Sequence, residues 1–370
     1  MHRLMAGITI LEHELSELRL LAERQAGILL DCPNSALAAH VAEYLEKEEL
    51  DSITALLERL RSSDQDPSAL PCFLDGVLNV NTGFFRHPGA MNTLSRCVIP
   101  QLFTRKSDDG PSTLRIWSAG CGTGEEAYSI AMALCDALPN GNGNGSCTGG
   151  SNGNGKEAKE KSTASRNGGV AEIPSSTLGM KDWSIHIVGT DLLPSAIEVA
   201  ERGLYPQSAL AGLPPATIRA CFSKIANTSG VQDGSGETSQ LPAANGSGLG
   251  SNGGSNGSNN GSSNGSNNGA HLLVKPRLRS FVTFNTMNLT KPVYIGRFDC
   301  IFCMDVLPHL SRAQRSALIE RLHLYLEPGG YLFLSQTEKL SAPNLNFRSE
   351  TFDGYTFHRK PLAASAAYGR

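Results

Sequence analysis

The sequence predicts a doubly wound α/β domain preceded by a small helical domain, and three features of the chain predict it. Strand-like and helix-like segments alternate after Leu114, as in a mainly parallel sheet with helices on both faces. A glycine-rich turn joins the first of these strands to a helix. Residues 8–60 instead repeat their apolar residues at helical spacing.

The formal net charge of the chain is −3 over 370 residues, so it lacks the excess of basic residues that is typical of proteins that bind nucleic acid or anionic lipid. Met1 to Leu11 lacks the features of a signal peptide, and no run of about twenty apolar residues occurs. We therefore expect a cytoplasmic protein that neither binds nucleic acid nor inserts into a membrane. The nine cysteines are scattered. Cys300 and Cys303 share a predicted strand, where residues three apart point to opposite faces, so no metal site is expected.

The helical domain is predicted at residues 1–66, where leucines such as Leu11, Leu15 and Leu18 recur at spacings of four and three. The acids crowded between Glu43 and Asp51 form either a solvated helix face or a docking surface. Arg61 to Pro71 is polar and contains proline, so it is interpreted as a linker. Residues 67–370 form the second predicted domain.

Asn79 to Arg86 places a polar cluster before two phenylalanines and an arginine. This segment is either a helix start with Phe84 and Phe85 in the core, or a strap across the top of the sheet that closes a cofactor pocket. The two interpretations are compatible. A helical run through Leu94 and Val98 then leads to the first strand.

The first strand, Leu114 to Ala119, ends in a turn with three glycines between Gly120 and Gly124. Glycine lets the backbone approach a ligand closely. Glu125 and Glu126 follow in the first helical turn, where the helix dipole favours acids. Acids at this point suit a cofactor with hydroxyls and positive charge better than a pyrophosphate.

The second strand, Trp183 to Asp191, also ends in an acid, and a helix is predicted from Pro194 to Arg202. Asp191 either grips a ribose diol or caps that helix. Residues 139–178 and 227–270 are rich in Gly, Asn and Ser, and they are expected to be disordered insertions.

The remaining elements follow from apolar runs and turn residues. A helix should end near Phe222, and Leu272 to Val274 should pair with a later strand. A terminal hairpin is expected from Ser349 to His358, around Asp353 and Gly354. Between these lie strands at Val282–Asn285, Phe298–Cys303 and Tyr331–Leu334, and a helix at Arg312–Leu326 that is stopped by Pro328–Gly330.

With these motifs the chain resembles the CheR-type chemotaxis protein-glutamate O-methyltransferase family. Thr82 to Arg86 resembles the family's Thr-x-Phe-Phe-Arg segment, and Ile116 to Met132 resembles its Ile-Trp-Ser-Ala-Gly-Cys-Ser-Thr-Gly-Glu-Glu-Pro-Tyr-Ser signature. Three shorter segments are also similar to the family: Thr190–Asp191, Asn288–Leu289 and Glu327–Leu334.

The resemblance implies a Rossmann-like methyltransferase sheet, with S-adenosyl-L-methionine as cofactor and S-adenosyl-L-homocysteine as product. It implies that His309 and Arg86 are catalytic. The implied substrates are glutamate carboxylates of a methyl-accepting chemoreceptor or a similar acidic protein, and such carboxylates need no general base because they are already ionised at neutral pH. The implied cofactor-binding residues are Asn81, Thr82, Arg86, Gly120, Gly122, Glu125, Glu126, Asp191, Asn288, Leu289, Met304 and Asp305. Which of Glu125 and Glu126 makes the contact stays open.

The chain departs from the family pattern where Phe-Cys-Arg-Asn-Val-Leu-Ile-Tyr-Phe is usual. Met304 and Asp305 replace the Arg-Asn pair, Pro308 interrupts a helix start, and His309 stands at the tyrosine position. His309 either orients a substrate or is structural. These changes motivate an alternative function, a non-catalytic S-adenosylmethionine-binding regulatory module derived from the family.

Overall fold

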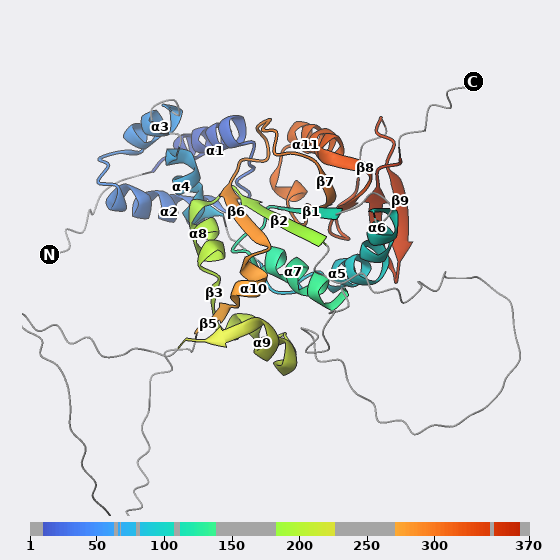
Figure 1. Ribbon diagram of the computed structural model, residues 1–370. Helices are drawn as coiled ribbons and strands as arrows, with labels where there is room; N and C mark the ends of the chain where they lie inside the picture. The colour runs from blue at the N-terminus through green and yellow to red at the C-terminus, as the bar shows by residue number, and fades with distance from the viewer. Residues whose placement is uncertain are drawn as a thin grey trace, which may run out of the picture.

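The computed structural model describes residues 10–62, 66, 68–78, 82–106, 112–137, 183–225, 271–340 and 344–362. Within them the chain forms a seven-stranded sheet covered by helices and a separate three-stranded sheet (Figure 1). Both expected insertions, residues 139–178 and 227–270, lie outside the described residues, as does the candidate Asn81. No helix in the described part of the chain is long and apolar enough to cross a membrane.

The large sheet has the strand order β6-β2-β1-β7-β8-β10-β9. The first five strands in this order run parallel, and β10 runs antiparallel to both β8 and β9. The direction of winding reverses between β1 and β7, which opens a crevice at the carboxyl ends of these strands. This order confirms the doubly wound prediction. The strands are β1 (Ser112–Ala119), β2 (Trp183–Asp191), β6 (Val282–Thr286), β7 (Phe298–Phe302), β8 (Leu326–Phe333), β9 (Arg348–Phe352) and β10 (Tyr355–Arg359).

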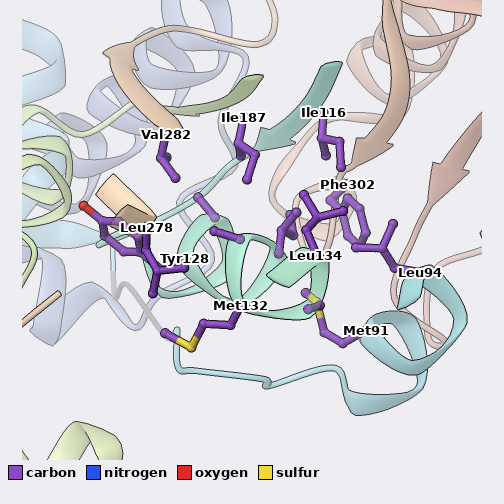
Figure 2. Packing of buried hydrophobic residues seen from close by; sticks show 14 of the residues in the cluster. Met91, Leu94, Ile116, Tyr128, Met132, Leu134, Ile187, Leu278, Val282 and Phe302 are labelled. Atoms are coloured by element: carbon purple, nitrogen blue, oxygen red, sulfur yellow. The ribbon is translucent and has the colours of Figure 1, made fainter. Parts of the chain in front are cut away.

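One face of the sheet packs on the helices that directly precede and follow β1, and on α10, a short helix later in the chain. Figure 2 shows Leu134 of the central helix beneath Ile116 and Phe302 of the sheet, with Met91 and Leu94 beyond it. These side chains are buried, so this cluster fixes the helix that starts directly after the glycine turn. The helices on this face are α5 (Pro88–Thr93), the π-helical turn η1 (Leu94–Val98), α6 (Ile99–Lys106), α7 (Glu125–Ala137) and α10 (Pro276–Arg279).

The opposite face carries the amino-terminal helices and α11 (Arg312–Tyr325) (Figure 1). Leu18, Leu56 and Phe73 of the amino-terminal helices share one buried cluster with Trp117 and Phe298 of the sheet. The proposed domain division at residue 66 stays a prediction. The helices are α1 (Glu12–Ala26), α2 (Asn34–Lys47), α3 (Ile53–Arg61) and α4 (Ala69–Val77), and α8 (Pro194–Arg202) packs between α4 and the strands β2 and β6.

Several predicted boundaries need correction. The linker expected to reach Pro71 ends earlier, because α4 begins at Ala69 and Pro71 lies in its first turn, where a missing N–H is tolerated. α11 ends at Tyr325, and Pro328 to Gly330 lie within β8 rather than stopping the helix. The carboxyl-terminal hairpin is confirmed.

The pairing predicted for Leu272 to Val274 is wrong. β5 (His271–Val274) lies between β3 (Leu204–Pro206) and β4 (Phe222–Lys224), and both of these partners precede it in the chain. The turn η4 (Gln207–Leu210) and helix α9 (Pro215–Cys221) connect β3 to β4. The strands β3, β5 and β4 form a small sheet beside the main one (Figure 1).

Candidate active site

A cavity of about 410 Å³ lies at the carboxyl ends of the central strands. This volume is typical of a small-molecule site. The walls come from the segment before α5, the turns after β1, β2 and β6, and the loop after β7. The predicted site residues that line it are Thr82, Arg86, Gly120, Gly122, Glu126, Asp191, Asn288, Leu289, Met304, Asp305 and His309. The structure therefore brings almost all of them together, and their individual roles stay predictions.

The glycine turn forms the floor of the cavity. Gly120 and Gly122 have φ angles of 86° and 54°, in the left-handed region that favours glycine. A Cβ atom on Gly120 would lie 2.5 Å from Cγ2 of Val306, so only glycine leaves room for the loop after β7. Gly124 has a different role, because a Cβ there would lie 2.7 Å from Cβ of Ala200 in α8.

Asp191 connects the ends of β1 and β2. Its Oδ2 atom accepts a hydrogen bond from the Gly122 backbone N–H at 2.9 Å, and its Oδ1 atom accepts one from the Leu193 N–H at 3.0 Å. Burial raises the pKa of Asp191, and these backbone hydrogen bonds oppose that rise. The alternative prediction of a helix cap is wrong, because the N-cap of α8 is Leu193. The carboxylate faces the cavity instead.

Of the two neighbouring glutamates, Glu126 lines the cavity and Glu125 does not. Successive residues of a helix point about 100° apart, so the two side chains take different positions relative to the cavity. Oε2 of Glu125 accepts a hydrogen bond from Thr123 Oγ1 at 2.7 Å. Oε1 of Glu126 accepts one from Ser118 Oγ at 2.6 Å.

Burial raises the pKa of Glu126 to about 7. The nearby carboxylates of Asp305 and Glu338 add to this rise, while the Ser118 hydrogen bond and the Arg86 charge oppose it. A buried acid among other acids is stabilised by a positive ligand. This end of the cavity therefore favours a cation.

The segment Thr82 to His87 crosses the top of the sheet, as one of the two sequence interpretations expected. Phe84 packs edge-on against Tyr205 and Phe222 of the small sheet, with ring centroids 5.0 and 5.4 Å apart. Phe85 lines the cavity in a left-handed conformation, with φ 51°, and its N–H donates to Ser129 Oγ at 2.9 Å. The chain thus turns at Phe85 and places Arg86 and His87 at the cavity rim.

Asp305 joins the loop after β7 to this strap. Its Oδ2 atom lies 3.0 Å from Nε2 of His87 and 3.3 Å from an Nη atom of Arg86. Its φ angle of 58° is left-handed, a conformation that Asp and Asn adopt more readily than other non-glycine residues. His87 was missed by the sequence analysis because only the fold brings it to Asp305.

Glu338, which the sequence analysis also missed, binds the backbone of the loop after β7. Its carboxylate accepts hydrogen bonds from the backbone N–H groups of Asp305, Leu307 and Ser335, at 3.1, 2.9 and 2.9 Å. The available signal was its position in the segment that follows β8, because the carboxyl ends of parallel neighbours meet at one edge of the sheet.

The amino-terminal helices contribute one wall. Ile28 lines the cavity and forms an antiparallel bridge with Leu310, and the Leu29 N–H donates to the His309 carbonyl oxygen at 2.8 Å. The His309 side chain is exposed at the rim. Thr290 Oγ1 donates to the Ala26 carbonyl oxygen at 3.0 Å, and its N–H donates to Oδ1 of Asn288 at 2.9 Å. The region after α1 is thereby connected to the loop after β6.

The charged groups of the cavity fit S-adenosylmethionine. This molecule carries a sulfonium and an ammonium, which suit the carboxylates of Glu126 and Asp305, and a carboxylate that suits Arg86. Asp191 offers two carboxylate oxygens to the ribose hydroxyls. In the described part of the chain, no group of three or more His, Cys, Asp and Glu side chains is placed to hold a metal ion.

Comparison with known proteins agrees with this chemistry. Residues 80–148 and 261–355 match the family model described as CheR methyltransferase, SAM binding domain. Chemotaxis protein methyltransferase 1 of Pseudomonas aeruginosa is 25% identical over 326 residues, which are 87% of this chain and 89% of that protein. Chemotaxis protein methyltransferase Cher2 of Pseudomonas putida is 24% identical over 331 residues, 89% of this chain and 90% of that protein.

One solved structure is similar only at a loose level. It is magnesium protoporphyrin IX methyltransferase of Synechocystis PCC 6803 with bound SAM. It is 12% identical with a TM-score of 0.27, and the match covers 75% of this chain and 84% of that chain.

Proposed function

Because this chain belongs to the CheR family of S-adenosylmethionine-dependent methyltransferases, we propose that it methylates glutamate side-chain carboxylates of chemoreceptor-like signalling proteins. One observation carries the proposal: the predicted cofactor residues surround one cavity at the crevice of the sheet. The curated relatives are named chemotaxis protein methyltransferases, which supports a chemosensory partner. A cytoplasmic location is part of the same proposal.

The residues of the cavity divide between the parts of the cofactor. Arg86 would hold its carboxylate and Glu126 its ammonium, while Asp191 would hold the ribose hydroxyls. Thr82 would lie beside the methionine portion, and Asn288 with Leu289 would lie beside the adenine. The glycines at 120 and 122 leave the floor open for close approach, and Met304 and Asp305 complete the wall.

The reaction needs no proton transfer. When bound, S-adenosylmethionine supplies a methyl group activated on its sulfonium. It would donate this methyl group to an acceptor carboxylate oxygen and leave as the neutral thioether. A glutamate carboxylate has an unperturbed pKa of about 4.3, so it is already the nucleophile at neutral pH. This chain would contribute orientation and exclusion of water, with His309 contacting the acceptor at the rim.

The experiment is incubation of the purified protein with labelled S-adenosylmethionine and acidic receptor fragments. Methyl esters are cleaved by mild base. The expected result is therefore a labelled fragment that loses its label as methanol when it is treated with base. Binding of S-adenosylhomocysteine is measured in parallel. If the protein binds S-adenosylhomocysteine but the fragments carry no base-labile label, the proposed reaction is excluded for those fragments.

A second candidate, a regulatory module that binds the cofactor without turnover, is favoured by one contact. Asp305 lies 3.3 Å from Arg86, so the arginine expected to hold the cofactor carboxylate already has an anionic partner. If this candidate is right, the wild type transfers no methyl group. A triple variant, Met304→Arg with Asp305→Asn and His309→Tyr, would then gain activity.

A further inference from the structure

An acceptor carboxylate that enters this cavity meets mainly other carboxylates. Glu126, Asp191 and Asp305 line the cavity, and Glu338 lies behind Asp305. The acceptor carboxylate would add one more negative charge to this group. It would be repelled unless a positively charged side chain bound it. Position 304, where the resembled family carries arginine, holds Met304 here. The acceptor side therefore needs a different cation.

The rim of the cavity carries the candidates. The side chains of Arg86 and Asp305 are each 35% exposed and that of His87 is 22% exposed, so all three can be reached from solvent. Glu126 and Asp191 lie deeper, where burial raises the pKa of each. A protein acceptor is too large to enter fully. It must therefore present its side chain at this rim.

His87 contacts Asp305 at the rim through one of its two ring nitrogens. Its Nε2 atom lies 3.0 Å from Oδ2 of Asp305, and the Asp305 backbone N–H is bound in turn by Glu338 at 3.1 Å. With Nε2 committed to Asp305, the second ring nitrogen, Nδ1, is left for another partner. A protonated imidazole donates from both nitrogens.

We propose that His87, oriented by Asp305, receives the acceptor carboxylate and supplies the positive charge that Met304 lacks. The inference rests on the proposed function, since it assumes a carboxylate acceptor. Arg86 shares Oδ2 of Asp305 with His87 in the structure, and it exchanges this contact for the carboxylate of the cofactor. His87 keeps its Asp305 contact and donates from Nδ1 to the acceptor, in a charge-assisted hydrogen bond.

The charged groups next to His87 come from two segments. Arg86 precedes it in the strap, and Asp305 faces it from the loop after β7, where Glu338 accepts a hydrogen bond from the Asp305 backbone N–H. Apart from Arg86 these groups are acids.

The test is the KM for an acidic receptor-derived peptide at saturating S-adenosylmethionine. His87→Gln keeps a hydrogen-bonding side chain that cannot carry a charge, so it should raise the KM at least about tenfold. His87→Arg carries a permanent charge, so its KM should stay close to that of the wild type. His13→Gln, an exposed position on α1, is the matched control and should behave as wild type.

Binding of S-adenosylhomocysteine by each variant separates the outcomes. Unchanged binding together with the KM pattern above supports the inference. Methyl esters formed with the same KM by wild type and His87→Gln would overturn the inference alone. Weaker S-adenosylhomocysteine binding in His87→Gln would overturn it too, because His87 would then hold the cofactor. No methyl ester from wild type with the cofactor bound would overturn the proposed function along with it.

Discussion

Oδ2 of Asp191 accepts a hydrogen bond from the backbone N–H of Gly122 at 2.9 Å. This contact fastens the glycine turn after β1 to the end of β2, beside the crevice where the winding direction reverses between β1 and β7. One carboxylate thus shapes the floor of the cavity and also faces the ligand. Changing it should affect both the fold and the binding of the cofactor.

Asp191→Ala should weaken S-adenosylhomocysteine binding at least about tenfold, because the ribose loses its acceptor. The variant should also lose about 1–3 kcal/mol of unfolding free energy, since the N–H groups of Gly122 and Leu193 lose their partner. Calorimetric titration and denaturant unfolding measure the two effects. Glu198→Ala, on a side chain that is 63% exposed, is the control and should change neither. Unchanged affinity in Asp191→Ala would remove Asp191 from the cofactor site.

Glu126 should make stability depend on pH. Burial raises its pKa in the folded protein to about 7 from an ordinary value of 4.5. The folded form therefore keeps a proton that the unfolded chain has lost between these two values, and stability falls as the pH rises through this window. Glu126→Gln cannot ionise. Its melting temperature relative to wild type should thus be higher at pH 8 than at pH 5, and a pH-independent difference would contradict this account.

The same group should tune cofactor binding. Ionised Glu126 attracts the positive charge of S-adenosylmethionine, so the wild-type affinity should rise as the pH increases from about 6 to 8. Glu126→Gln should bind more weakly at pH 8 and show a flatter profile. Titrations of both proteins at several pH values check this. If the two profiles were parallel, Glu126 would not be the group that responds to the cofactor.

Gly120→Ala should be strongly destabilising. The residue has a φ of 86°, and its new Cβ would lie 2.5 Å from Cγ2 of Val306. The combined strain and overpacking should cost about 2–4 kcal/mol in unfolding free energy. Gly83→Ala is the matched control, because nothing lies within 4 Å of the Cβ position there. Adding Val306→Ala should recover part of the loss, and no recovery would show that the contact with Val306 is not the cause.

Glu338→Ala should release the loop after β7. Three backbone N–H groups would lose their acceptor, so the expected loss of unfolding free energy is at least about 2 kcal/mol. Because Asp305 would lose its anchor, hydrogen exchange should speed up around residues 304–307. Lys339→Ala, at an exposed neighbouring position, should leave that exchange unchanged. Slow exchange in Glu338→Ala would mean that the loop is held by other contacts.

The central part of the fold was accessible from the sequence because its strands are short apolar runs that end in glycine or acid. The run into Gly120 and the run into Asp191 both became parallel strands at the predicted positions. The partners of β5 were predicted wrongly, because a four-residue strand has no pattern that selects its neighbours. The start of α4 was missed because Pro71 reads as a linker residue, although proline is compatible with a first helical turn.

The residues that line the cavity were predictable where a local motif carried them, as in the glycine turn and the strap around Arg86. Glu125 and Glu126 could not be told apart, because the side that a helix presents to a ligand is set by its packing on the sheet. His87 and Glu338 act through contacts to Asp305, which is 218 and 33 residues away in the sequence. Such contacts arise from strand order, and they leave no local pattern.

The most direct measurement of the central claim is the mass of an acidic receptor fragment after incubation with this protein and S-adenosylmethionine. The account predicts a gain of one methylene unit per modified glutamate, located on glutamate by fragmentation and lost after mild base. The gain should disappear with Asp191→Ala and persist with Glu198→Ala. A base-stable gain on another residue type, or no gain from a protein that binds S-adenosylhomocysteine, would contradict the account.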